Sequence, residues 1–184
     1  MPTSRALFLD RDGVINTDAG YTYKISEFNF IDGIFDLCRV ANELGYLLVV
    51  ATNQAGIGRG YYTETDFQRL TEWMKLQFIA NSAPLAAVYH CPYHPDGIGN
   101  YRKQSDWRKP APGMLLAAAA DLNLDLGQSV LVGDKEHDIA AAKAAGLGAS
   151  ILFGNPAQIT STADAVLTAH LEIAAWLRRY SKTP

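Results

Sequence analysis

Two aspartates follow a short apolar run near the start of the chain, and their spacing suits chemistry at phosphorus. Asp10 and Asp12 come directly after the apolar run 6–9 and lead into Gly13. A buried strand would hold Asp10 rigidly, and the carboxylate two residues later could reach the same substrate atom. Aspartate is a weak nucleophile, but a metal ion can align it with phosphorus and reduce their charge repulsion. A lone D-x-D is more often a turn or a helix cap, so the pair needs support from elsewhere.

Three further polar segments also carry groups that suit a phosphoryl substrate. Thr52-Asn53 closes an apolar run with a hydroxyl and an amide, and Arg108-Lys109-Pro110 supplies two cations before a helical stretch. The segment 133–138, G-D-K-E-H-D, adds carboxylates after another apolar run. Mg²⁺ takes oxygen ligands and usually only a few protein carboxylates, a pattern that Asp10 and Asp134 fit. Each segment alone is weak evidence, but all four in this order are hard to attribute to chance.

The elements that must position these residues alternate between strand and helix. We expect strands at 6–9, 47–51, 86–90, 130–132 and 149–153, with a short sixth at 164–167. Apolar spacing and capping signals predict helices over 34–44, 63–78, 114–122, 139–145 and 171–180. The segment 91–112 has the composition of a long loop. This alternation predicts a parallel sheet covered on both faces, and such sheets bind ligands at the carboxyl ends of their strands.

Composition limits the class of protein. The 184 residues, with 48% hydrophobic and 19% charged, predict a single domain over 1–184. A net charge of −3 provides no basic excess, so we expect neither nucleic acid nor membrane as a partner. Cys38 and Cys91 cannot form a disulfide framework. We find no signal peptide and no apolar run of membrane-spanning length, so we expect a cytoplasmic protein, and we expect a monomer.

Four sequence motifs together resemble those of the haloacid dehalogenase-like phosphatases. They are D-R-D-G-V-I-N, A-T-N-Q, R-K-P and V-G-D-K-x-x-D, and the resemblance covers nearly the whole chain. Segments 21–33, 53–60, 91–95 and 108–115 are similar to the branch that acts on heptose 1,7-bisphosphates. The resemblance implies a doubly wound, mainly parallel Rossmann-like α/β sheet. The length leaves no room for a separate cap domain, so loops 18–21, 56–60 and 91–110 would select the substrate.

The resemblance also implies a role for each matching residue. Asp10 would attack phosphorus and become an aspartyl phosphate, while Asp12 would protonate the leaving sugar oxygen and later deprotonate water. Mg²⁺ would be held by the Asp10 carboxylate, the Asp12 backbone carbonyl and Asp134, and Thr52 and Lys109 would hold the phosphoryl oxygens. The residues that would contact substrate are Asp18, Ala19, Gly20, Tyr21, Asn53, Gln54, Ala55, Arg108 and Lys135. The Arg108 fork suits a second phosphate.

The long loop departs from the family pattern at a zinc site. Many relatives bind zinc there through Cys-x-His and Cys-x-Cys, but the matching positions are Cys91, Tyr93, Ser105 and Trp107. Structural zinc normally requires four Cys or His ligands, and only Cys91 is retained. We therefore expect no zinc, and we expect Tyr93 and Trp107 to pack the loop. A substitute site built from Cys91, His94 and His90 is a less favoured alternative.

The implied activity is Mg²⁺-dependent hydrolysis of the 7-phosphate of a heptose 1,7-bisphosphate, on the route to the ADP-heptose of lipopolysaccharide core. The nearest alternative is the same chemistry on histidinol phosphate or another small phosphate ester. A receiver-like phosphoacceptor is a more distant alternative, because in receivers the phosphorylated aspartate follows a later strand than the acidic pair. We interpret His137 as an exposed residue at a helix start, His170 as a cap of the last helix, and Cys38 as a core residue.

Overall fold

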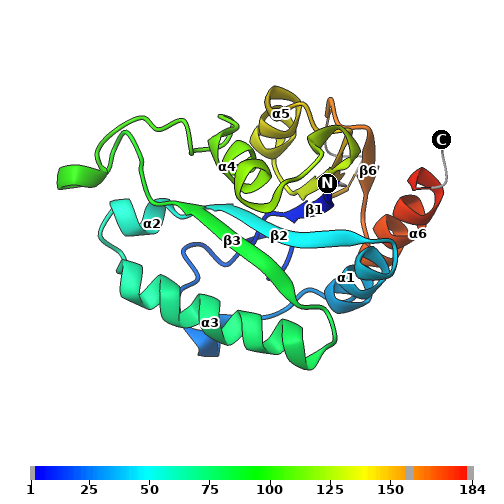
Figure 1. The fold of residues 1–184 in the computed structure, drawn as a ribbon. Coiled ribbons are helices and arrows are strands. Elements are labelled where there is room, and N and C mark those ends of the chain that lie inside the picture. Colours follow the sequence, from blue (N-terminus) through cyan, green and yellow to red (C-terminus); the bar gives the residue numbers. More distant parts are fainter. Residues whose placement is uncertain (1–2, 156–159, 182–184) are drawn as a thin grey trace.

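A six-stranded parallel sheet forms the centre of the molecule (Figure 1). The computed structural model describes residues 3–155 and 160–181, so the ends of the predicted 1–184 domain lie outside the described residues. The sheet order is β3-β2-β1-β4-β5-β6. The strands are β1 (Arg5–Leu9), β2 (Tyr46–Asn53), β3 (Leu85–Cys91), β4 (Val130–Gly133), β5 (Ala149–Phe153) and β6 (Ala165–Leu167). This order is that of the Rossmann-like sheet expected from the resemblance.

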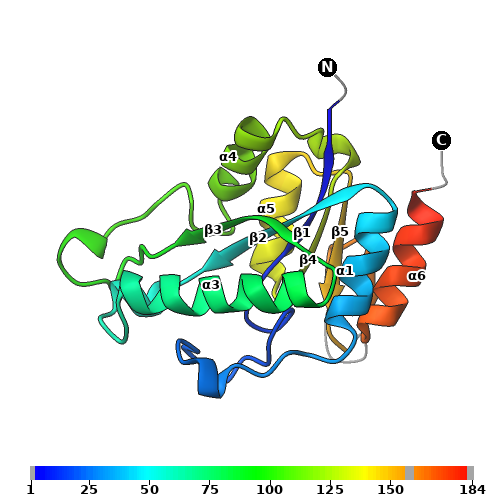
Figure 2. The ribbon, with the colours of Figure 1, turned by 60° about the horizontal axis from the view of Figure 1, so that its bottom comes forward.

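Helices cover both faces of the sheet, as Figures 1 and 2 show. On one face lie α1, α3 and α6, and on the other lie α4 and α5. Their bounds, with the short helix α2, are α1 (Ile34–Glu43), α2 (Ala55–Gly58), α3 (Glu64–Ala80), α4 (Gly113–Leu122), α5 (Glu136–Ala145) and α6 (His170–Tyr180). The predicted capping box at the start of α3 is present. In the described part of the chain these elements and their loops leave no separate cap domain.

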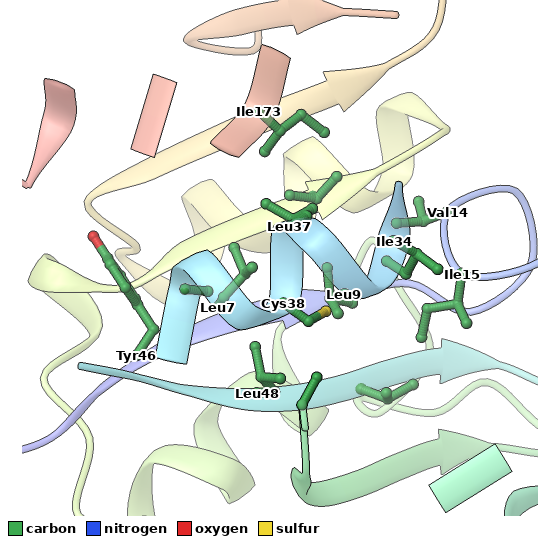
Figure 3. Packing of buried hydrophobic residues seen from close by; sticks show 14 of the residues in the cluster. Leu7, Leu9, Val14, Ile15, Ile34, Leu37, Cys38, Tyr46, Leu48 and Ile173 are labelled. Carbon is green, nitrogen blue, oxygen red and sulfur yellow. The ribbon is translucent and has the colours of Figure 1, made fainter. Parts of the chain in front are cut away.

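Strand β1 shows why both faces must be covered. Its side chains alternate between the two faces, and all of them from Ala6 to Leu9 are buried. Leu7 and Leu9 belong to the core cluster with α1, which Figure 3 shows beside Leu37 and Cys38. The other two apolar residues of the strand pack in the cluster with α4 and α5. A strand buried in this way is held firmly, and so is the residue that follows it.

The sheet order brings the polar strand ends together. Strands β1 and β4 are central neighbours, with Leu9 paired to Val132, so Asp10 and Asp134 emerge side by side. The backbone N–H of Asp10 continues the ladder by donating to Val132 at 3.0 Å. Strand β2 lies on the other side of β1 and ends at Thr52-Asn53. The crevice between β1 and β4 is where the chain direction along the sheet reverses, which is the position at which such folds bind ligands.

Three local features differ from the sequence-based expectations. Residues 55–58 form α2 within a segment predicted as loop, and residues 99–101 form a 3₁₀ turn within the long loop. His170, expected as a helix cap, is buried, and its Nδ1 lies 3.0 Å from the backbone carbonyl oxygen of Asp32. The imidazole ring of His170 also stacks on the ring of Phe153, so the side chain packs in the interior. No helix within residues 3–155 and 160–181 is long and apolar enough to cross a bilayer.

Candidate active site

A cavity of about 290 Å³ opens at the carboxyl ends of β1, β2 and β4. Eleven predicted site residues line it: Asp10, Asp12, Asp18, Gly20, Tyr21, Thr52, Asn53, Gln54, Ala55, Arg108 and Lys135. Tyr62 and His137 complete the lining. Three predicted site residues do not line it: Lys109, Asp134 and the exposed Ala19. The sequence motifs therefore converge on one cavity, with Lys109 and Asp134 packed behind its wall.

Lys109 is buried and lies between two carboxylates. Its Nζ is 3.1 Å from Asp10 Oδ1 and 2.7 Å from Asp138 Oδ1, and it donates to the Ala51 carbonyl at 2.7 Å. Burial alone would lower the pKa of Lys109, but the two carboxylates outweigh it and raise the pKa. Lys109 is therefore held as a cation beside Asp10, where it can also attract an anionic group.

Asp10 is a buried carboxyl group whose ionisation depends on its neighbours. Its side chain is buried, and burial together with the charges of Asp138, Asp134 and Asp12 raises its pKa to about 7 despite Lys109. One of its oxygens accepts the backbone N–H of Arg11 at 2.8 Å. Its ionised form depends on compensating positive charge, which Lys109 provides in part and a bound cation would increase.

Asp138 is a site residue that the sequence-based assignments missed. It is fully buried, pairs with Lys109, and accepts the backbone N–H of Lys135 at 3.1 Å. It occupies the first turn of α5 and thus locks that helix to the end of β4. The signal was present, because Asp138 is the last residue of V-G-D-K-x-x-D, but its partner could not be read from spacing.

Asp12 is held by donors from three residues, two in its own segment after β1 and one directly after the end of β2. Arg11 Nη2 lies 2.9 Å from Asp12 Oδ2, Asn16 Nδ2 donates to Oδ1 at 3.0 Å, and Gln54 Nε2 donates to Oδ2 at 3.0 Å. Arg11 is itself buried and also donates to the Thr22 carbonyl at 2.7 Å. These contacts fix the direction of the Asp12 carboxylate and link it to the loop that carries Asp18 to Tyr21. The roles of Arg11 and Asn16 were not predicted.

The segment after β2 orients the remaining polar groups. Gln54 Nε2 also donates to Thr52 Oγ1 at 2.9 Å, and Gln54 Oε1 accepts from the Tyr62 hydroxyl. The Asn53 amide exchanges two hydrogen bonds of 3.1 Å with the backbone of Lys109. The A-T-N-Q motif, at the carboxyl end of β2, thus fixes both Asp12 and the Lys109 backbone.

The residues present fit a hard divalent cation at the end of β4. Asp134 Oδ1 is buried and has no hydrogen-bond partner among the residues that the structure describes. Burial and the charges of Asp138 and Asp18 raise the pKa of Asp134 to about 6, although Lys135 opposes this. Gly13 has φ +87 and passes so close that a Cβ there would lie 2.3 Å from Asp134 Oδ2. The Asp10 and Asp134 carboxylates and the Asp12 carbonyl are the oxygen donors that would hold Mg²⁺.

A second group of candidate ligands has a different character. One ligand atom each from Asp10, His137 and Asp138 lies within 4.8 Å of the others. The Lys109 ammonium already pairs with both carboxylates of this group, which disfavours a cation there. His137, expected to be exposed, is half-buried and lines the cavity, because the first turn of α5 directs it toward Asp138 at 3.5 Å. Burial lowers the pKa of His137.

Comparison with known proteins identifies the family. The HAD-hydrolase-like family model matches residues 106–155. The D-glycero-α-D-manno-heptose-1,7-bisphosphate 7-phosphatase of Burkholderia mallei is 56% identical over 89% of this chain and 88% of its own length. The chain belongs to the heptose-1,7-bisphosphate 7-phosphatase family of haloacid dehalogenase-like hydrolases.

Other relatives agree with this assignment. The D-glycero-β-D-manno-heptose-1,7-bisphosphate 7-phosphatase of Escherichia coli K12 is 43% identical over 96% of this chain and 95% of its own length. A crystal structure of D,D-heptose 1,7-bisphosphate phosphatase from B. bronchiseptica, complexed with magnesium and phosphate, superposes with a TM-score of 0.82. It is 28% identical and covers 95% of this chain and 98% of that one. The fold class and the family expected from the sequence motifs are therefore confirmed.

Within this family, the long loop of the chain is built differently from a four-ligand zinc site. Cys91 is buried, and its thiol contacts the side chain of Ser105. Burial raises the pKa of the Cys91 thiol. Tyr93 lies under the ammonium of Lys103 at 4.0 Å. Trp107 remains 41% exposed, so it packs the loop less completely than expected.

Proposed function

We propose that this chain hydrolyses the 7-phosphate of D-glycero-D-manno-heptose 1,7-bisphosphate with the help of Mg²⁺. The observation that carries the proposal is the convergence of Asp10, Lys109 and Asp134 at one end of the sheet, beside a cavity that also has cationic side chains. The names of the relatives supply the substrate class, since both relatives are named as 7-phosphatases of a heptose 1,7-bisphosphate. The site and the family therefore support the same reaction.

Asp10 is the proposed nucleophile. Its carboxylate oxygen forms a bond to phosphorus while the bond from phosphorus to the sugar O7 breaks, giving an aspartyl phosphate. Lys109 and Thr52 hold the phosphoryl oxygens, whose charge distribution changes as the bonds are exchanged. When bound, Mg²⁺ neutralises phosphoryl charge and aligns it with the nucleophile. The strand end and Lys109 keep Asp10 in the orientation that in-line attack needs.

Asp12 is the proposed acid and base. It gives a proton to the departing sugar oxygen, and in the second half-reaction it takes a proton from the water that attacks the aspartyl phosphate. Hydrolysis then releases inorganic phosphate and restores the Asp10 carboxylate. Arg11, Asn16 and Gln54 keep the Asp12 carboxylate directed at this position between the two steps.

We propose that the remaining cavity residues bind the heptose and its second phosphate. Arg108 is half-buried, and its Nη1 has no partner in the described part of the chain, so it is available for an anionic group. Lys135 pairs with Asp18 at 3.1 Å on another side of the cavity. Asp18, Ala19, Gly20, Tyr21, Asn53, Gln54 and Ala55 then supply polar and backbone groups to the sugar. Ala19 is the weakest member, because it lies outside the cavity lining.

The test is phosphate release from purified protein with a panel of phosphate esters. We expect Mg²⁺-dependent turnover of heptose 1,7-bisphosphate with a higher kcat/KM than for histidinol phosphate. We further expect the α anomer to be preferred over the β anomer, because the relative at 56% identity is named for α and the one at 43% for β. Faster turnover of histidinol phosphate would overturn the proposed substrate, and a β preference would overturn only the anomer.

The remaining parts of the proposal concern metal, assembly and location. We propose a cytoplasmic monomer that contributes to ADP-heptose synthesis and holds no structural zinc. The replacement of zinc ligands by Tyr93, Ser105 and Trp107 supports the last point. Elemental analysis after purification without added metal should show no stoichiometric zinc. Light scattering of the eluted protein should give the mass of one chain, and a dimer mass would overturn the monomer assignment.

A further inference from the structure

Arg59 joins the two loops that border the cavity, although it is not among the residues that line the cavity. It follows α2 as its C-terminal cap. Its Nη1 donates to the Tyr21 hydroxyl at 2.8 Å, and its Nη2 lies 3.2 Å from His94 Nε2 and 3.8 Å from Asp96 Oδ2. One guanidinium therefore contacts both loop 18–21 and loop 91–110. A guanidinium presents its donors in fixed directions on a planar fork, so it suits partners on two separate loops better than the compact ammonium of a lysine does.

The backbone around α2 fixes where this guanidinium lies. The Gly58 carbonyl accepts the N–H of Ile98 at 2.7 Å, so the turn and the long loop are hydrogen-bonded directly. A Cβ on Gly58 would lie 2.3 Å from the Pro92 carbonyl oxygen, so the glycine is required by the close approach. A Cβ on Gly56 would lie 2.8 Å from a ring carbon of Tyr21. Both loops are thus packed against α2, immediately beside Arg59.

The charges in this region are unbalanced. Arg59, Arg108 and His94 lie close enough to affect one another, and Asp96, the acid beside Arg59, is 79% exposed. Burial and the charge of Arg59 lower the pKa of Arg108, while burial and both arginines lower the pKa of His94. Arg59 Nε and Arg108 Nη1 are buried without hydrogen-bond partners within the described residues. Like charges held together in this way are stabilised when an anion binds between or beside them.

We propose that Arg59 is a specificity-determining positioning residue, which completes the receptor for the phosphate that is not hydrolysed. It does so by holding Tyr21 at the cavity wall, by tying loop 91–110 to α2, and by adding positive charge beside Arg108. The proposal rests on the proposed bisphosphate substrate and goes beyond it, because it assigns discrimination between bisphosphate and monophosphate to a residue behind the cavity wall. Chemistry at Asp10 does not depend on Arg59.

The experiment compares two substrates that differ only in the second phosphate, namely heptose 1,7-bisphosphate and heptose 7-phosphate. For Arg59→Met we expect KM for the bisphosphate to rise about tenfold or more, with little change in kcat. KM for the monophosphate should rise much less, because that substrate is affected only through the position of Tyr21, so the preference for the bisphosphate falls. Arg178→Met is the matched control, since it removes one positive charge from exposed α6, at the opposite end of the sheet in Figure 1, and should change neither KM.

Two further variants separate bridging from charge and protect against a folding defect. Arg59→Lys keeps the charge but loses the planar fork that reaches both loops in fixed directions, so it should restore only part of the discrimination. Tyr21→Phe removes only the hydroxyl that Arg59 holds and should raise KM for the bisphosphate less than Arg59→Met does. Equal effects of Arg59→Met on both substrates, or full restoration by lysine, would overturn the proposal. Failure of wild-type protein to hydrolyse the bisphosphate would instead overturn the proposed function.

Discussion

Two regions of the site differ in burial. The floor is the largely buried group of Asp10, Lys109, Asp134 and Asp138, and the mouth is the more exposed pair of Asp18 and Lys135. At the floor, Lys109 and Asp138 are almost fully buried and pair at 2.7 Å. Asp138 lies in α5, which packs in the core cluster with α4, and Lys109 lies at the end of the long loop. At the mouth, Lys135 and Asp18 are partly exposed and pair at 3.1 Å, between a helix start and a loop. A buried charge without its partner is costly, whereas an exposed pair contributes little to stability. We infer that the floor determines the chemistry and that the mouth can vary with substrate.

The largest expected effect comes from replacing Asp10, the proposed nucleophile of the floor. Asp10→Asn keeps the size of the side chain but removes the oxygen nucleophile, so kcat should fall by at least about 10⁴-fold. Phosphate release with saturating substrate and Mg²⁺ measures this, and circular dichroism checks the fold. Asp36→Asn, on the exposed face of α1, is the matched control and should retain full activity. Retained turnover in Asp10→Asn would exclude Asp10 as the nucleophile.

A second variant tests whether the floor is held by its buried pair. Asp138→Asn removes one of the two carboxylates around Lys109 while Asp10 remains, so Lys109 loses a position-defining partner. We expect kcat to fall about a hundredfold and the free energy of unfolding to fall by about 3 kcal/mol. Urea denaturation and steady-state kinetics measure the two effects. If stability falls while kcat is unchanged, Asp138 supports the fold but does not position Lys109.

The contrast between floor and mouth also describes what the sequence could predict. Strand–helix alternation placed Asp10, Thr52 and Asp134 correctly at neighbouring strand ends. The reason is that the carboxyl ends of parallel strands lie at the same edge of the sheet. The partner of Lys109 was not predictable in the same way. Lys109 lies near the end of the long, mostly irregular connection between β3 and α4, and its contact with Asp138 depends on how that connection returns to the sheet. The roles of Arg11, just after β1, and of His137, in the first turn of α5, were missed for a related reason, since the direction of both side chains depends on tertiary packing.

A third prediction uses the raised pKa values of the floor. Asp10 and Asp134 have pKa values raised from 3.8 to about 7 and about 6. The metal-free folded protein therefore binds protons more tightly than the unfolded chain, and these groups should make it less stable as pH rises from about 4 to 7. At the proposed site Mg²⁺ would bind the ionised carboxylates, so its stabilising effect should grow over the same range.

Thermal unfolding with and without Mg²⁺ measures this dependence. The increase in Tm on adding Mg²⁺ should be larger near about pH 8 than near about pH 5. Asp134→Asn should remove most of the increase at the higher pH, because it loses the buried oxygen that has no other partner among the described residues. An equal increase in Tm at both pH values would show that these carboxylates are not the ligands of the cation.

The smallest expected effect lies at the mouth, and its sign is informative. Lys135 Nζ is 3.1 Å from Asp18, a proposed substrate contact, and 3.6 Å from Asp134, a proposed metal ligand. Lys135→Met should raise KM for the bisphosphate several-fold by removing a cation from the cavity wall, with kcat nearly unchanged. The same change removes a charge that repels Mg²⁺, so the Mg²⁺ concentration for half-maximal activity should fall. Lys143→Met on the same helix is the control, since its ammonium contacts the Thr162 carbonyl instead. Movement of both constants in the same direction would show that Lys135 acts on the fold of the site as a whole, and the mouth would then be coupled to the floor.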